Sequence, residues 1–139
     1  MRCSHSLFVR EEWREVEAVN NWALLNVGRW PELETLQVDI SGAKLSPAAH
    51  SVLYRMGRKK GWPDLHLPVA RLGYHALFIE VKRRDGGAGL SEAQIKIHRH
   101  LRRQNNLVRV TLGSDEAISA IDNYLNWSQL PGVKEGGYK

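Results

Sequence analysis

Two neighbouring strand-forming runs, residues 64–69 and 74–81, are the feature that most constrains the fold of this chain. Both runs are rich in branched and aromatic side chains, and the short segment ARLG between them is typical of a hairpin-like connection. Charged residues nevertheless stand at one end of each run: Asp64 begins the first, Glu80 lies near the end of the second, and Lys82 directly follows it. A sheet normally buries hydrocarbon, so three charges at this place require a chemical explanation.

The alternation of side chains along the second run separates its two faces. Successive side chains of a strand point in opposite directions, so Phe78, Glu80 and Lys82 share one face. The opposite face carries apolar side chains: Leu77, Ile79 and Val81. Pro63 suits a strand start, where the ladder needs no N–H donor. If the two runs pair as a hairpin, Asp64 comes to lie beside Glu80 at one end of the sheet.

Two carboxylates and a lysine in this arrangement are suited to hydrolysis. Carboxylates that are held close together repel each other, which raises the pKa of one of them. A divalent cation relieves that repulsion, and oxygen ligands with open positions suit Mg²⁺ or Mn²⁺. A nearby lysine can orient an attacking water and offset developing charge, as metal-assisted phosphodiester hydrolysis requires. The alternative is that Glu80 and Lys82 form a solvated strand face and Asp64 is a turn residue.

The rest of the chain predicts an α/β fold. Helical periodicity covers residues 10–27, a weak alternation at 36–40 favours a strand, and Ser46 or Pro47 begins a helix that runs to Met56. Three elements are expected after the glycine-rich loop: a helix over residues 91–104, a strand over 107–112 and a helix from 113 to about 125. This order predicts a mixed central sheet flanked by helices. We expect one domain over residues 1–130 and a loose, glycine-rich tail at 131–139.

The composition is that of an ordinary soluble domain. The chain has 139 residues, of which 42% are hydrophobic and 25% charged. No apolar run approaches the roughly 18 residues of a membrane span, and the N-terminus lacks the apolar region of a signal peptide. A single cysteine, Cys3, cannot form an internal disulfide. We therefore expect a cytoplasmic protein without a membrane partner. The net charge of +5 favours a polyanionic binding partner.

The ordered set of motifs resembles a known nuclease family. Pro63-Asp64, fifteen further residues and Glu80-Val81-Lys82 resemble the PD-(D/E)XK nuclease signature. The longer string GWPDLHLP…GYHALFIEVKRRDGGAGLSEAQ…LRRQNNLVRVTLGSDEAISAIDNYL resembles the virus-type replication-repair nuclease family, VRR-NUC. This resemblance covers residues 57–125 well, whereas the first 55 residues match loosely.

The resemblance implies both a fold and a set of site residues. It implies a restriction-endonuclease-like core in which Asp64, Glu80 and the backbone carbonyl of Val81 bind the metal, with Lys82 as the catalytic lysine. Small standalone members of the family look like homodimeric resolvases of four-way (Holliday) junctions, and larger members carry the module in DNA-repair nucleases. The setting implied is the cytoplasm of a bacterium or of a phage-infected host.

Gln94 lies within the apolar stripe of the helix expected from Ser91. The neighbouring stripe residues are Leu90, Ala93, Ile97 and Leu101. A buried glutamine needs hydrogen-bond partners. It is therefore either a satisfied core residue or a side chain that reaches the active site from beside the sheet. Gln94 matches the family's motif glutamine, which favours the second interpretation.

Glu12 raises the same question on the first helix. It lies in the middle of an apolar stripe made by Val16, Val19, Ala23 and Val27. A carboxylate on a buried face is costly unless it is paired or bound to a metal. Related nucleases carry an acidic residue on their first helix that completes the site, so Glu12 is our candidate and Glu15 the runner-up. The alternative is a frayed helix that leaves Glu12 in water.

The histidines give no further site at this level. The six histidines show no zinc-binding spacing, and His98 and His100, two apart on one helix, do not face each other. No serine or cysteine nucleophile arrangement and no phosphate-loop glycine pattern is present either. The sequence therefore concentrates its chemistry on the carboxylate–lysine motif.

Basic residues flank that motif on both sides and are our candidates for contacts to DNA phosphates: Arg58, Lys59, Lys60, Arg83 and Arg84. The function we expect is a Mg²⁺- or Mn²⁺-dependent, structure-specific DNA endonuclease, and we favour a homodimeric resolvase of branched DNA. One alternative is a flap- or single-strand-specific nuclease that acts with a partner. The other is a DNA-binding module without catalysis.

Overall fold

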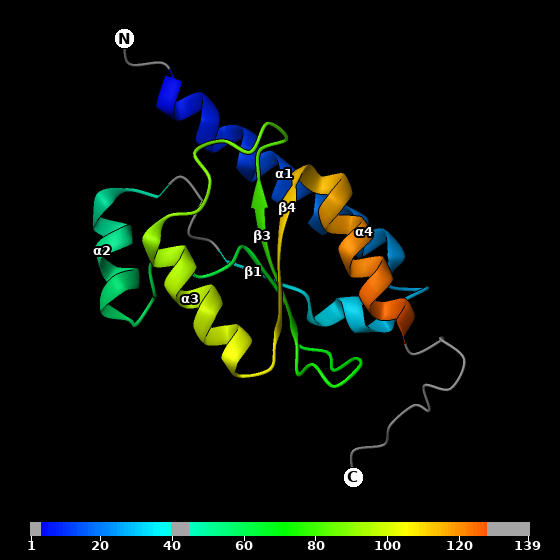
Figure 1. The fold of residues 1–139 in the computed structure, drawn as a ribbon. Coiled ribbons are helices and arrows are strands. Elements are labelled where there is room, and N and C mark those ends of the chain that lie inside the picture. Colours follow the sequence, from blue (N-terminus) through cyan, green and yellow to red (C-terminus); the bar gives the residue numbers. More distant parts are fainter. Residues whose placement is uncertain (1–3, 40–44, 128–139) are drawn as a thin grey trace.

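The computed structural model describes residues 4–39 and 45–127, arranged around a four-stranded mixed sheet (Figure 1). The strands lie in the order β1 (Gln37–Val38), β2 (Leu65–Leu67), β3 (Leu77–Lys82) and β4 (Leu107–Leu112). The first three strands pair antiparallel, and β4 runs parallel to β3. The connection from β3 to β4 passes through a helix, as a parallel pair requires. The α/β class predicted from the sequence is therefore confirmed.

Helices cover both faces of the sheet. On one face, α1 (Ser4–Asn26) packs against α4 (Gly113–Asn126), and on the other lies α3 (Glu92–Arg103) (Figure 1). The short helix α2 (Pro47–Arg55) stands beside α3 and has no buried residue. A 3₁₀ helix, η1 (Pro31–Thr35), follows α1 and was not expected from the sequence. The result is a three-layer arrangement with β3 in its centre.

All six residues of β3 are buried, and its two faces enter different clusters. One set of apolar side chains joins the main core with α1 and α4: Leu77, Ile79 and Val81. Phe78 packs instead with Leu101 and Val108 in a smaller cluster on the α3 side. Glu80 and Lys82 share the face of Phe78 and are only 3% and 8% exposed. This burial rules out the interpretation of these two residues as a solvated strand face.

Several element boundaries differ from those that the sequence predicts. The paired part of the first run covers only Leu65–Leu67, and β3 begins at Leu77 rather than at residue 74. Between the two strands, Arg71 and Tyr74 form an isolated bridge around a tight turn. Periodicity and composition define an extended segment, whereas the length of a strand also depends on how far its partner continues beside it.

The helices follow the sequence more closely. Ser46 caps α2 by accepting a hydrogen bond from the Ala49 N–H at 3.1 Å, and Ser91 caps α3. The first helix begins earlier than predicted, at Ser4. No helix in the described part of the chain is long and apolar enough to cross a membrane. The tail predicted at 131–139 lies outside the described residues, so its character and the extent of the domain stay predictions.

Candidate functional site

The antiparallel register of β2 and β3 places Asp64 at the end of the sheet. Leu65 pairs with Ile79, so Asp64, one residue earlier, lies alongside the last residues of β3. Its Oδ2 accepts a hydrogen bond from the Val81 N–H at 2.8 Å. Its main-chain carbonyl accepts from the Asp39 N–H, also at 2.8 Å. The carboxylate is thereby fixed beside the Glu80–Lys82 segment, where the hairpin predicted it.

Glu80, Lys82 and Gln94 form a closed set of polar contacts between the sheet and α3. Glu80 Oε1 accepts a hydrogen bond from Gln94 Nε2 at 2.7 Å and lies 3.5 Å from Lys82 Nζ. Lys82 Nζ in turn donates to Gln94 Oε1 at 3.3 Å. Each of the three side chains therefore contacts the other two, and the glutamine amide reaches the site as the sequence suggested.

The first turn of α3 holds the Gln94 side chain in place. Gln94 Oε1 accepts a hydrogen bond from the Ser91 N–H at 2.9 Å, and the main-chain N–H of Gln94 donates to Ser91 Oγ at 3.2 Å. This reciprocal pair is a capping box, which satisfies two main-chain donors that a helix start would otherwise leave unpaired. The amide oxygen that stabilises the helix is also the acceptor for Lys82 Nζ.

Gly61 controls how closely the segment before Asp64 approaches α3. Its φ is +86°, and a Cβ atom at this position would stand 2.7 Å from the main-chain nitrogen of Gln94 and 2.5 Å from the carbonyl oxygen of Ala93. No side chain fits there, and the conformation itself favours glycine. The close approach lets residues from the β2 end and from α3 meet at one site.

The electrostatics of the site are those of two carboxylates taken out of water. Burial and then the nearby Glu80 carboxylate raise the pKa of Asp64 from 3.8 to about 8. The hydrogen bond from Val81 and the charge of Lys82 lower this pKa, but they do not cancel the increase. Glu80 Oε2 is buried and has no hydrogen-bond partner among the described residues. When both carboxylates are ionised, the site carries more negative charge than Lys82 alone balances.

These donors fit a hard divalent cation. The carboxylates of Asp64 and Glu80 offer oxygen ligands of the kind that Mg²⁺ and Mn²⁺ take. In a strand the C=O of a residue points to the same side as its N–H, so the Val81 carbonyl faces the side on which Asp64 lies. This set contains two carboxylates and one main-chain oxygen. In residues 4–39 and 45–127, no group of three or more His, Cys, Asp or Glu side chains forms a metal centre.

The two acids considered on the first helix have different surroundings. The charge of Glu12, which is half-buried, contributes to the raised pKa of Asp64. Glu15 Oε2 accepts from the Ser114 N–H at 2.6 Å, and its Oε1 accepts from Arg84 Nε at 3.2 Å. Burial alone would raise the pKa of Glu15, but the hydrogen bonds from Ser114 and Arg84 outweigh it and lower the pKa. Glu15 therefore caps the start of α4, and Glu12 is the acid whose charge acts on the site.

The predicted DNA-binding residues divide into two groups. Arg83 pairs with Asp85, and Arg84 pairs with Glu15 and with Asp115. Arg58 lies 3.3 Å from His50 and over the ring of Tyr54. By contrast, Lys59 and Lys60 are exposed in the turn after α2 and form no ion pair with a described residue. The structure thus leaves the charge of these two lysines accessible to a partner, whereas both arginines after β3 already have carboxylate partners.

His98 is a neighbour of the site that the sequence analysis missed. Its side chain is fully buried under the sheet, and its Nε2 lies 3.7 Å from Glu80 Oε2. The sequence analysis compared His98 with His100, although the informative spacing is four residues, one helical turn beyond Gln94. Gln94 and His98 therefore project from the same side of α3 towards β3.

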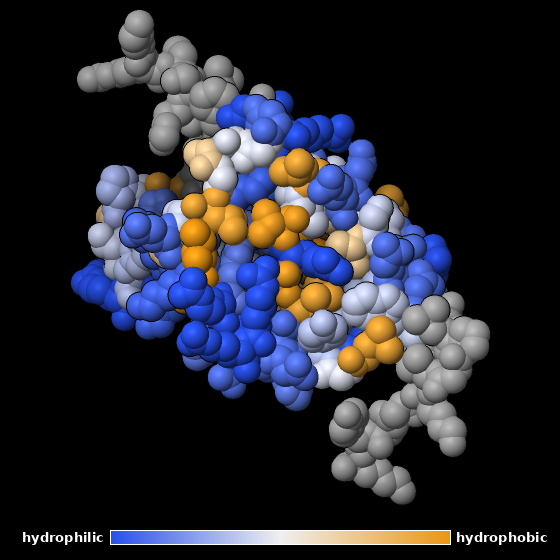
Figure 2. Space-filling model, in the orientation of Figure 1, coloured by the Kyte–Doolittle hydropathy of each residue, from blue (hydrophilic) through white to orange (hydrophobic). Residues whose placement is uncertain are grey.

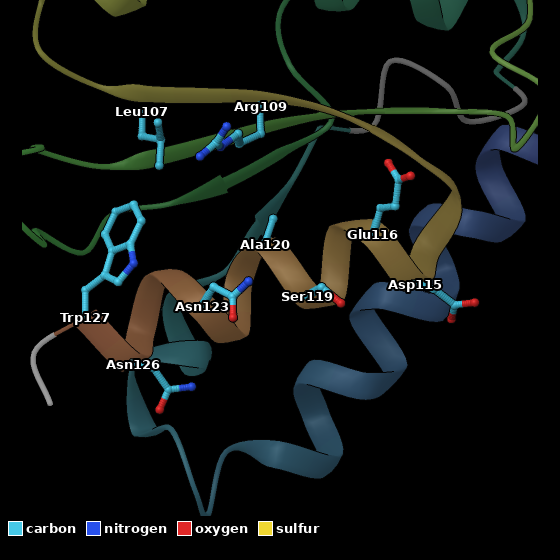
Figure 3. Close-up of a pocket in the computed structure, with 9 residues that line it drawn as sticks. All are labelled: Leu107, Arg109, Asp115, Glu116, Ser119, Ala120, Asn123, Asn126 and Trp127. Carbon is cyan, nitrogen blue, oxygen red and sulfur yellow. The ribbon is translucent and has the colours of Figure 1, made fainter. Parts of the chain in front are cut away.

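A surface groove without any of the site carboxylates lies elsewhere on the molecule. It has a volume of about 700 Å³ and runs between β4 and α4 (Figure 3). The side chains that line it come from these two elements and from Trp127, directly after α4, and include none of the predicted site residues. We place the candidate site at the carboxylates at the end of β3, because charge, burial and mutual contacts converge there.

Replacing Gly61 tests the close approach to α3. We expect Gly61→Ala to lower the free energy of unfolding, measured in urea, by more than the roughly 1–2 kcal/mol of a left-handed alanine. Gly73→Ala is the matched control, since Gly73 has a φ of +83° and nothing within 4 Å of an added Cβ. Equal losses in the two variants would mean that Gly61 supplies only its backbone conformation.

The pKa of Asp64 predicts a specific pH dependence. In EDTA, the folded state holds a proton on Asp64 up to about pH 8, whereas the unfolded chain loses it near 3.8. The stability of the wild type relative to Asp64→Asn should therefore be highest below pH 4. It should fall as the pH rises towards 8, because the unfolded chain then releases a proton that the folded protein retains. Thermal unfolding of both proteins over this range measures the difference, and parallel curves would contradict the assignment.

Comparison with known proteins places this site in a family. No family model and no curated protein matches the chain. Among solved structures, one described as a "VRR_NUC domain protein" covers 84% of this chain and 89% of its own, with a TM-score of 0.68 and 30% sequence identity. The restriction-endonuclease-like fold predicted from the sequence is confirmed by this match. With its fold and identity shared over most of both chains, this protein belongs to the VRR-NUC family of nuclease domains.

Proposed function

We propose that this protein is a Mg²⁺- or Mn²⁺-dependent DNA endonuclease that hydrolyses phosphodiester bonds in branched DNA. One observation carries the proposal. Glu80 and Lys82 on β3 converge at one buried end of the sheet with Asp64 from before β2 and with Gln94 from α3. Membership of a nuclease family supports the same reaction class. A module that only bound DNA would have no need of this set of buried charges.

In the proposed reaction each side chain has a distinct task. Asp64, Glu80 and the Val81 carbonyl would hold the cation, which would supply an activated water and stabilise charge on the phosphate. Lys82 Nζ, fixed by its contacts to Glu80 and Gln94, donates a hydrogen bond to the attacking water or to a phosphate oxygen and offsets the developing negative charge. Glu12 contributes a further carboxylate beside Asp64.

The segment before the site supplies a surface for the DNA backbone. Residues 45–63 contain no aspartate or glutamate and carry four cations: Arg55, Arg58, Lys59 and Lys60. Gly61 packs on Ala93 and Gln94, so the turn with the two lysines lies next to the first turn of α3 and hence near the carboxylates. Phosphates bound by Lys59 and Lys60 would position a strand without reading its sequence.

We further propose that the protein acts as a homodimer on four-way junctions, because two active sites related by a two-fold axis suit paired nicks in a symmetric junction. Exposed apolar side chains beside β4 support a contact surface: Ile95, Val110 and Leu112 are 40–42% exposed. Figure 2 shows apolar side chains gathered over α3 and β4 on this face.

The edge of β4 limits how a second copy could bind there. The Val108 carbonyl accepts a hydrogen bond from Arg102, and the Leu112 N–H donates to Glu116 Oε2. Charged side chains that occupy a strand edge hinder the addition of another strand. A partner at this face would therefore contact the apolar side chains rather than extend the sheet.

Cleavage assays test the proposed function. With Mg²⁺ or Mn²⁺, labelled four-way junctions should be nicked symmetrically, and Lys82→Ala should reduce the rate by about 10²-fold or more. Lys96→Ala is the matched control, since Lys96 is exposed on α3. The oligomeric state is measured by light scattering.

The outcomes separate the proposed substrates. If a monomer cut flaps or single strands and left junctions intact, the resolvase proposal would be wrong. The alternative, a flap- or single-strand-specific nuclease that acts with a partner, would then be supported. If the protein bound DNA but cut no substrate with either metal, the catalytic roles of Asp64 and Glu80 would be wrong.

Salt dependence tests the DNA path. Each phosphate contact contributes about 0.9 to the slope of log affinity against log salt. A double variant, Lys59→Ala with Lys60→Ala, should therefore bind junction DNA more weakly and reduce the slope by roughly 2. Lys96→Ala with Arg99→Ala removes two exposed cations from α3 and should leave the slope near the wild-type value. Equal slopes for the wild type and the Lys59–Lys60 variant would exclude this path.

A further inference from the structure

His98 occupies a position that is unusual for an imidazole. Its side chain is 1% exposed, and neither ring nitrogen has a hydrogen-bond partner among the described residues. The hydrophobic cluster on this side of the sheet, to which α3 contributes two residues, consists of Ala76, Phe78, Ile97, Leu101 and Val108. A leucine would fill such a place without polar atoms. A buried polar group without a partner in a native protein calls for a specific reason.

A buried carboxylate oxygen of Glu80, the proposed metal ligand, lies beside the ring. His98 Nε2 lies 3.7 Å from Glu80 Oε2, an oxygen that is itself buried and without a hydrogen bond from any described residue. This separation is longer than a hydrogen bond, so a small side-chain rotation is needed to bring the two atoms together. Donor and acceptor therefore face each other, and each lacks another partner in the described part of the chain.

Helix geometry gives His98 and Gln94 a common target. The two residues are four apart on α3, so their side chains lie one above the other on one face. Gln94 Nε2 already donates to Glu80 Oε1 at 2.7 Å. A donor from His98 to Oε2 would fix the second oxygen of the same carboxylate and so prevent its rotation about the terminal bond.

We propose that His98 is a positioning residue for Glu80, whose Nε2–H holds Oε2 while Gln94 holds Oε1. The inference rests on the proposed function, because it assigns Glu80 as a metal ligand. Groups that orient a ligating side chain commonly change metal affinity by about 10- to 100-fold when they are removed. The role of His98 is to keep the Glu80 carboxylate in one orientation, which lowers the entropic loss when the cation binds.

Three variants separate positioning from simple packing. His98→Leu fills the space without a donor, and His98→Gln restores an amide N–H at the same position. Leu101→Ala weakens the same buried stripe of α3 one turn further on, away from the carboxylate, and controls for lost stability. Mn²⁺ binding is measured by calorimetry, and thermal unfolding in EDTA measures stability without metal.

Positioning predicts a distinct pattern across these variants. We expect the dissociation constant for Mn²⁺ to rise about 10-fold or more in His98→Leu, to return towards wild type in His98→Gln and to stay unchanged in Leu101→Ala despite a lower melting temperature. In EDTA, the shift in melting temperature caused by His98→Leu should differ between the wild-type and Glu80→Gln backgrounds, because the two groups interact. Unchanged Mn²⁺ affinity in His98→Leu, or identical shifts in both backgrounds, would overturn the proposal.

These readouts keep the two proposals distinguishable. Failure of the wild type to cut DNA would remove the proposed function, while the metal-free comparison would still decide whether His98 and Glu80 interact. Normal cleavage and normal Mn²⁺ affinity in His98→Leu would leave the nuclease intact and remove the role of His98. Loss of affinity in His98→Leu that His98→Gln does not restore would identify a packing effect and would also overturn it.

Discussion

The register between β2 and β3 is the constraint on which the site depends. Leu65 lies opposite Ile79, and this single alignment puts Asp64 beside Val81 and sends Glu80 and Lys82 towards α3. A slip of one residue would turn every side chain of β3 to the other face. The main core would then receive a carboxylate and a lysine. Burial of the apolar face and assembly of the polar site therefore select the same pairing.

Burial also gives the site its chemical character. In a medium of low dielectric constant, both the repulsion between carboxylates and the attraction to a cation are stronger than in water. The cost of the buried charges is offset by the ion pair between Glu80 and Lys82 and by the hydrogen bonds of both to the Gln94 amide. Asp64 is hard to ionise here, because burial and then the neighbouring Glu80 carboxylate raise its pKa.

Local patterns in the sequence were sufficient to predict the centre of the fold, but they were insufficient to predict contacts between residues far apart in the chain. The alternation in β3, the cap at Ser91 and the convergence of Asp64 with Glu80 follow from periods and spacings within a few tens of residues. The role of Glu15 depends instead on Ser114, 99 residues away, and no local pattern carries that information. His98 has a local signal, its four-residue spacing from Gln94, but its meaning depends on Glu80, which lies across the layer on β3.

The double use of Gln94 narrows the residues that its position can accept. A capping box takes glutamate or glutamine at the third position of a helix, and both serve the helix about equally well. Beside Glu80, however, a glutamate would add a like charge and remove the amide that donates to Oε1. Helix initiation permits two amino acids here and the electrostatics of the site permit one of them. A substitution that would pass unnoticed at an ordinary helix start is therefore forbidden at this one.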